Sequence, residues 1–170
     1  AARNHGLRLV RELPFVAFLD SDDRWPADFL ERTVAAMRAR PDAAAVSAPR
    51  RLVDPAGKTL RYAELSDMAV NPIPWFFAHG AGVASCTLLR TEVVDRVGGW
   101  REELATCEDT FLFAGVALAG PWLLAPGEAV CFSRGLAAAQ KESGNLSSAR
   151  SNRLLRQMWA VDHERLYDEI

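Results

Sequence analysis

A short apolar segment that ends abruptly in carboxylates constrains the fold of this 170-residue chain more than any other stretch. Pro14 opens the apolar run at 15–19, and Asp20, Asp22 and Asp23 follow it directly. The run is rich in strand-forming residues and predicts a buried strand of a parallel sheet. Because open α/β sheets bind ligands at the carboxyl ends of their strands, we expect the three acids to lie at a ligand site.

Three carboxylates crowded into four residues repel one another unless they share a cation. Mg²⁺ and Mn²⁺ prefer oxygen ligands, and Mg²⁺ commonly binds one or two carboxylates together with substrate phosphates. The cluster therefore suggests a metal that bridges the protein to a phosphorylated ligand. The alternative is a turn with a helix cap, since Asp and Ser are common in both. Pro26 at a first helical position would make Trp25 the cap and Asp28 the first-turn acid, which leaves the cluster without a capping role.

The composition is that of a soluble globular domain with one core. Hydrophobic residues make up 49% of the chain and charged residues 25%. The net charge of −2 gives no broad basic surface for a nucleic acid, and no apolar run is long enough to span a membrane. We expect the widely spaced Cys86, Cys107 and Cys131 to be reduced thiols that pack in the core of a cytoplasmic protein.

Hydrophobic periodicity and turn signals predict alternating helices and strands along the chain. The predicted helices are 1–12, 27–40, a short one capped by Thr91 and stopped by Gly98, 108–119 and 151–167. The predicted strands are 14–20, 43–52, a hairpin partner after the turn at 54–58, 85–90, 122–125 and 129–133. Residues 64–82 are expected to be irregular with aromatic packing, and 135–150 to form a polar loop. The alternation predicts one α/β domain over 1–170, with a mixed, mostly parallel sheet flanked by helices.

A second acidic site occurs far downstream, where Glu108 and Asp109 open a predicted helix. Thr106 and Asp109 have the spacing of a capping box, and acids are favourable at a helix N-terminus, so capping is one interpretation. The other is catalytic, because a carboxylate can serve as a general base if it reaches a substrate hydroxyl. Spacing along the chain does not decide between them.

Four short motifs, taken in order, resemble those of the family 2 glycosyltransferases, which have the GT-A fold. That family typically has an A-x-R-N-x-G-type helix start, a strand ending in a D-x-D-type motif, a G-G-[FW]-x-E loop and an E-D pair that opens a helix. The corresponding segments here are 2–6, 18–23, 98–102 and 108–109, and the resemblance covers roughly residues 1–135. It implies a GT-A-like (Rossmann-like) fold that lacks its N-terminal nucleotide-binding strands. The chain begins with Ala rather than Met, which suggests a fragment or a truncated product.

The resemblance implies a metal-dependent reaction. A nucleotide-sugar donor would pass its sugar to a hydroxyl of a glycan or lipid-linked acceptor, usually with inversion. Mn²⁺ or Mg²⁺ would be the cofactor. The family implies a bacterial role in cell-surface polysaccharide or glycoconjugate synthesis, with peripheral membrane association and no transmembrane segment.

The resemblance also assigns roles to residues on the donor side. The positions that would bind the donor nucleotide-sugar are Arg3, Asn4, Asp20 and Asp22. Asp22, together with Asp23, would hold the metal against the diphosphate. For Arg3 and Asn4 the alternative is a helix start with a surface arginine.

On the acceptor side, Asp109 resembles the general base of the family, and Glu108 would support or orient it. His79 and Gly80 could line the acceptor site, although an ordinary loop explains them as well. Trp100 could stack on a sugar ring or anchor the core. Two other functions remain open: a truncated, non-catalytic glycosyltransferase-like binding module, and a sugar nucleotidyltransferase.

Overall fold

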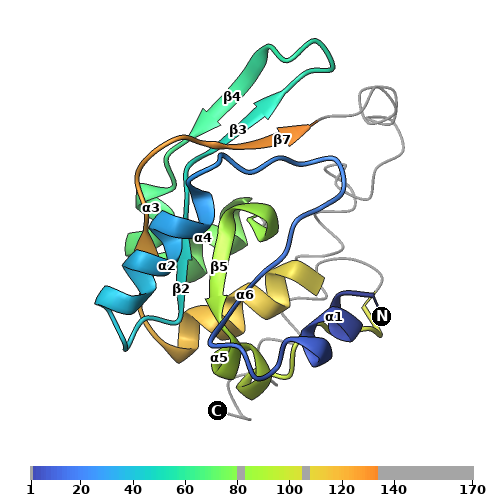
Figure 1. Cartoon of the computed structure of the whole chain (residues 1–170), viewed down its shortest axis with the longest axis vertical. Helices are drawn as coiled ribbons and strands as arrows, with labels where there is room; N and C mark the ends of the chain where they lie inside the picture. The colour runs from blue at the N-terminus through green and yellow to red at the C-terminus, as the bar shows by residue number, and fades with distance from the viewer. Residues whose placement is uncertain (1, 80–82, 105–107, 134–170) are drawn as a thin grey trace. The chain divides into compact units, whose positions relative to one another are not determined.

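The computed structural model describes residues 2–79, 83–104 and 108–133 (Figure 1). The chain divides into two compact units, Ala1–Arg134 and Gly135–Ile170, and the described residues all belong to the first. The predicted loop at 135–150 and helix at 151–167 lie outside the described residues, as do Gly80 and Cys107.

Four strands form the central sheet of the first unit. Their spatial order is β1 (Phe15–Ala17), β5 (Thr87–Arg90), β2 (Ala45–Ser47) and β6 (Trp122–Leu124). β5 runs antiparallel to both of its neighbours, whereas β2 and β6 are parallel. β1, β2 and β6 therefore point the same way, and their carboxyl ends share one edge of the sheet.

A second, three-stranded sheet has the order β4 (Thr59–Ala63), β3 (Arg50–Val53) and β7 (Val130–Ser133). β3 and β4 form an antiparallel hairpin, and β3 pairs in parallel with β7. The single strand predicted over 43–52 is thus two strands, one in each sheet. The chain crosses between the sheets at Ala48 and Pro49, and Pro49 has no N–H with which to continue a ladder.

The expected α/β class with a mixed sheet is confirmed, but the predominance of parallel pairing is not. Of the five strand pairs among the described residues, three are antiparallel and two are parallel. The reason is the position of β5, which lies between two strands that run the other way. Hydrophobic patterning does not report strand direction.

Helices cover the central sheet on both faces. On one face Met37 of α2 (Phe29–Ala39) packs with Val46 of β2 and Leu88 of β5. On the other face lie α3 (Ser66–Val70), α4 (Pro72–His79) and α6 (Glu108–Ala119). Phe76 of α4 and Phe113 of α6 meet the Trp122 ring, with centroid separations of 5.3 and 5.9 Å.

The segment at 64–82 is more regular than the sequence suggests. Its prolines predict irregular backbone, yet Pro72 is the first residue of α4, a position where the missing N–H leaves no hydrogen bond unmade. The expected aromatic packing is confirmed by Phe76, which is fully buried.

Two predicted helix starts are wrong. α2 begins at Phe29 with Asp28 as its N-cap, so Pro26 and Trp25 precede the helix. α5 (Thr91–Arg96) has Arg90 at its N-cap, and the buried Thr91 hydroxyl has no hydrogen-bond partner among the described residues. Gly98 adopts a φ of 87° after α5, as expected of a residue that ends a helix.

The short helix α1 (Ala2–Leu9) ends three residues earlier than predicted. In Figure 1 it lies near α6, at the end of the unit away from the β3–β4 hairpin. Cys86 and Cys131 are buried free thiols, as predicted.

Candidate active site

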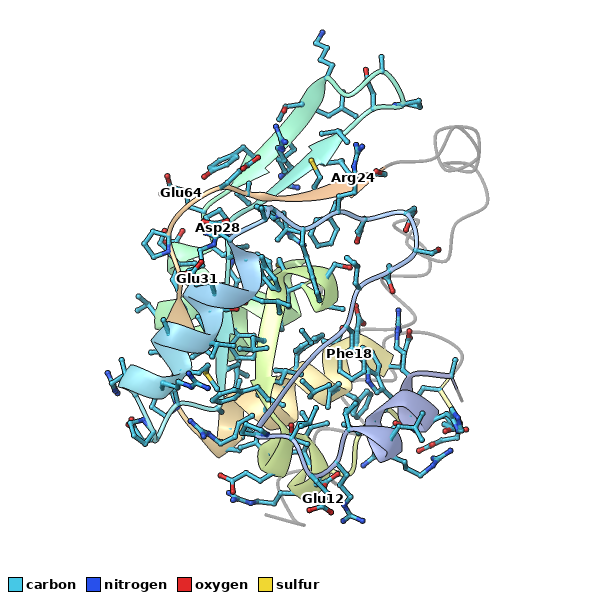
Figure 2. The ribbon with its side chains drawn as sticks, in the orientation of Figure 1. Glu12, Phe18, Arg24, Asp28, Glu31 and Glu64 are labelled. Carbon is cyan, nitrogen blue, oxygen red and sulfur yellow. The ribbon has the colours of Figure 1, made fainter. Side chains whose placement is uncertain are left out.

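The three predicted acids lie on a tight loop, which we call the acid loop (residues 20–24). The Asp23 N–H donates to the Asp20 carbonyl at 3.0 Å and closes the turn. Arg24 then pairs with Cys131 of β7 through both of its backbone groups, at 2.9 Å each. Figure 2 labels Arg24 where this segment runs beside β7. The acid loop therefore connects the central sheet to the second sheet.

The three carboxylates have different surroundings. The Asp20 side chain is 45% exposed and carries an ion pair, and Asp22 is exposed. Asp23 is half-buried, and its Oδ1 accepts the Ser133 N–H at 3.1 Å. Burial raises the pKa of Asp23, the negative charges of Asp22 and Asp20 add to the rise, and hydrogen bonds from Ser85 and Ser133 oppose it.

Arg3 of α1 joins the two acidic sites that the sequence separates by 88 positions (108 − 20). Its Nη2 lies 2.8 Å from Asp20 Oδ1, and its Nη1 lies 3.3 Å from Glu108 Oε1. Its Cζ lies 4.4 Å from the centroid of the Trp100 ring. Partial burial opposes the charge, but the hydrogen bonds and charges of both carboxylates outweigh it, so the pKa of Arg3 lies above its ordinary value.

Asn4, the next residue of α1, holds the glycine loop (residues 98–102). Its Nδ2 donates to the Trp100 carbonyl at 2.7 Å and to Glu102 Oε1 at 2.8 Å. Its Oδ1 accepts the Trp100 N–H at 3.0 Å. Gly99 has a φ of 68°, and a Cβ at that position would lie 3.1 Å from Asn4 Oδ1. The three hydrogen bonds of the Asn4 side chain thus join it to the glycine loop, and two of them go to the backbone of Trp100.

The Trp100 ring is packed inside the protein and is only 4% exposed. Phe18, labelled in Figure 2, contacts it edge-to-face at a centroid distance of 5.1 Å, and Phe113 lies at 6.1 Å. With Arg3 over the ring as well, this arrangement favours the core-anchor interpretation over stacking on a sugar.

Glu108 and Asp109 are the first two residues of α6, as the sequence predicts. The Asp109 Oδ1 accepts the backbone N–H of Thr110 at 2.7 Å and its hydroxyl at 3.2 Å. One of the free N–H groups at the helix start is thereby satisfied, so Asp109 contributes to capping. Thr106, the other residue of the predicted capping box, lies outside the described residues.

The acceptor-side residues are less completely described. His79 is the last residue of α4, and its side-chain surroundings are not described. Gly80 lies outside the described ranges.

A buried hydroxyl that sequence reasoning missed also touches the acid loop. The Ser85 Oγ accepts the Asp20 N–H at 3.1 Å, and Ser85 also bonds the Asp23 side chain. A serine at the predicted start of a strand gives no signal of such a contact, because its partners lie more than 60 positions away.

The described residues contain no group of three or more His, Cys, Asp or Glu side chains that could hold a metal ion by themselves. A cation at the acid loop would thus have fewer than three such ligands among the described residues, and Mg²⁺ commonly obtains others from substrate phosphates. The exposed Asp22 carboxylate fits such an arrangement as a single protein ligand.

Fold and site together define an α/β domain of the GT-A-like class. The model of the family described as glycosyl transferase family 2 matches residues 1–98, which are 98 of the 170 residues. The chain belongs to glycosyl transferase family 2. The match includes α1, the acid loop and β5, and it ends before Trp100 and the Glu108–Asp109 pair. A search of curated proteins finds no match. Within residues 2–79, 83–104 and 108–133, no helix is long and apolar enough to cross a membrane.

Proposed function

We propose that this chain is a metal-dependent inverting glycosyltransferase that moves a sugar from a nucleotide-sugar donor to an acceptor hydroxyl. The observation that carries the proposal is the Arg3 bridge between Asp20 and Glu108. It brings the acid loop and the acids of α6 to one place, which a transfer between a donor and an acceptor requires. Family membership supports the same class of reaction.

On the donor side, Asp22 is the proposed metal ligand and Asp20 the residue nearest the nucleotide. Asp22 is exposed, whereas the Asp23 carboxylate already accepts hydrogen bonds from Ser85 and Ser133. Asp23 would then anchor the loop and reach the metal less directly. A divalent cation bound at Asp22 would neutralise charge that develops on the leaving diphosphate.

On the acceptor side, Asp109 is the proposed general base. Its carboxylate would take the proton of the acceptor hydroxyl as that oxygen attacks the anomeric carbon. The bond from this carbon to the diphosphate breaks, and the diphosphate leaves with the electron pair. Glu108 would stay paired with Arg3, which leaves the proton transfer to Asp109. We propose a glycan or lipid-linked acceptor of a cell-surface pathway.

Thermal unfolding with UDP, GDP, dTDP and CDP, each with Mn²⁺ and with EDTA, tests the donor site. A ligand at about 100 times its Kd stabilises the folded state by roughly 2.7 kcal/mol. That corresponds to a rise of roughly 5–10 °C in Tm for a chain of this size. A rise that needs Mn²⁺ and one nucleotide supports the proposal. No rise with any of the four would favour a non-catalytic binding module instead.

Asp109→Asn tests the proposed base. We expect transfer to be lost while the Mn²⁺-dependent rise in Tm is kept, because the amide cannot take a proton but can still accept a hydrogen bond. Asp95→Asn is the matched control, since Asp95 is ion-paired with Arg11 on the surface at 2.8 Å. Transfer that survives in Asp109→Asn would leave this carboxylate with its capping role alone.

A further inference from the structure

We propose that Ser85 is a positioning residue that holds the acid loop in the geometry needed for the donor and its metal. The inference rests on the proposed function and deepens it, because it assigns a role at the same site to a residue that no motif contains. Ser85 lies in the 3-10 turn η1 (Ala84–Cys86) that precedes β5, and it is fully buried.

Ser85 contacts the acid loop and its flank at three points. Its Oγ accepts the N–H of Asp20, and Ser85 also bonds the Asp23 carboxylate. Its carbonyl accepts the indole N–H of Trp25 at 2.6 Å, directly after the loop. A carboxylate can only accept and an N–H can only donate, so the atom between Asp20 and Asp23 must do both. Among neutral groups of this size, a hydroxyl meets that requirement.

This arrangement fixes the residues on both sides of Asp22 while Asp22 itself stays exposed. A ligand that binds a loop already ordered loses less conformational entropy than one that must order the loop. Groups that orient metal ligands from behind typically matter by about 10- to 100-fold in metal affinity. We therefore expect the Ser85 hydroxyl to influence donor affinity without touching the donor.

The test compares Ser85→Ala with Ser47→Ala. Ser47 is a matched control because its hydroxyl is also fully buried and also has two partners, Thr87 Oγ1 at 2.7 Å and Trp122 Nε1 at 3.0 Å. These partners are side chains of β5 and β6, and neither of them belongs to the acid loop. Both variants should lower Tm to a similar extent.

The readout is the Kd of UDP, GDP, dTDP and CDP with Mn²⁺, measured by titration calorimetry well below the Tm of each variant. We expect Ser85→Ala to weaken binding by at least about tenfold and Ser47→Ala to leave it within about twofold. The same Kd in the two variants, whether unchanged or weakened, would overturn the inference. If the unaltered chain binds none of the four nucleotides, the proposed function fails and this role fails with it.

Ser85→Thr keeps the test decisive should Ser85→Ala not fold. Threonine retains the hydroxyl, so we expect it to restore most of the affinity even where its extra methyl lowers Tm. In parallel, amide hydrogen exchange at Asp20 and Asp23 should be faster in Ser85→Ala than in Ser47→Ala. Unchanged protection of both amides would show that the hydroxyl does not order the loop.

Discussion

At the scale of single residues, the guanidinium of Arg3 joins the two acidic sites and also packs on an aromatic ring. Its planar fork reaches Asp20 with one nitrogen and Glu108 with another, and its face lies on Trp100. Lysine lacks this geometry, because an ammonium is a compact point charge that does not stack as a plane. The two ion pairs and the ring contact together therefore fit the shape of an arginine side chain better than that of a lysine.

Arg3→Lys should lower the affinity for the Mn²⁺–nucleotide complex by about tenfold. The reason is the loss of one charge-assisted hydrogen bond, which contributes about 1.5–3 kcal/mol in favourable cases and less where solvent screens it, as here. Titration calorimetry with the four nucleoside diphosphates measures the change. Arg8→Lys is the control, since Arg8 is an exposed residue of the same helix. An equal affinity in both variants would contradict the bridging role.

Cys86 should be unreactive in the folded protein. Burial raises the pKa of its thiol to about 12, from an ordinary value of 9.0. At pH 9.0, where a thiol with that ordinary pKa is half ionised, iodoacetamide should label Cys86 only after unfolding. Mass spectrometry of the digested protein measures the labelling. Modification at the same rate before and after unfolding would contradict the burial.

The same pKa gives a pH dependence of stability. Above about pH 9 the unfolded chain releases the Cys86 proton while the folded chain keeps it, up to about pH 12. The free energy of unfolding should therefore fall as the pH rises, by about 1.4 kcal/mol per unit. Cys86→Ala lacks this contribution, so its stability relative to the unaltered chain should improve over the same range in urea titrations. If the difference in the free energy of unfolding between the two proteins does not change with pH, the Cys86 thiol does not cause the pH dependence.

The residue types of the site could be predicted from the sequence, but not their contacts. Asp20 and Asp22 follow a strand and Glu108 opens a helix, as local patterns indicate. The Asn4 bonds to Trp100 and the Ser85 bonds to the acid loop join positions far apart in the chain. Periodicity describes only neighbours within a few turns, so it carries no information on such pairs.

At the scale of elements, α1 and the glycine loop are held together by side-chain hydrogen bonds. Asn4 makes three hydrogen bonds to the loop, and Gly99 allows the close approach that these bonds require. Element boundaries were the weaker part of the sequence prediction. Pro49 divides one predicted strand between two sheets, and Pro72 starts a helix where irregular backbone was expected. A proline has opposite meanings at the start and in the interior of an element, and the pattern alone does not say which applies.

Gly99→Ala should destabilise the fold more than Gly98→Ala. Both glycines have positive φ, 68° and 87°, so both substitutions strain the backbone, by about 1 kcal/mol each. Only at Gly99 would the new methyl also press on Asn4, while the space around Gly98 is open. We expect an additional loss of about 1–2 kcal/mol, since the Asn4 hydrogen bonds would be disturbed.

Thermal or urea unfolding of the two variants measures this difference, and Gly98→Ala supplies the control for backbone strain. Asn4→Ala should abolish the difference, because it removes the atom with which the methyl would collide. Equal destabilisation by the two glycine substitutions would mean that the loop does not rest on Asn4.

At the scale of the whole described unit, burial is uneven between the two sheets. Strand β2 is buried throughout, whereas residues 59–62 of β4 are all exposed, with Leu60 and Tyr62 each 52% exposed. The fold class could be predicted because alternating helices and strands admit few architectures. The division into two sheets could not, because it depends on strand pairing between distant segments.

Amide hydrogen exchange should separate the two sheets. We expect the β4 amides to exchange through local opening of the hairpin, and those of β2 and β5 only through global unfolding. In low concentrations of urea, exchange at β2 should accelerate steeply, while exchange at β4 should hardly change. Exchange of both strands with the same urea dependence would show that the hairpin opens only with the core.

The Asn4 contact also limits how parts can be recombined among relatives. A chimera that takes α1 from one family member and the glycine loop from another would keep the contact only if the two parents supply a compatible pair. The amide at position 4 needs a residue without a side chain at position 99, and the converse holds as well. Although more than 90 positions separate Asn4 from Gly99 along the chain, the two segments should be exchanged and redesigned together as a single module.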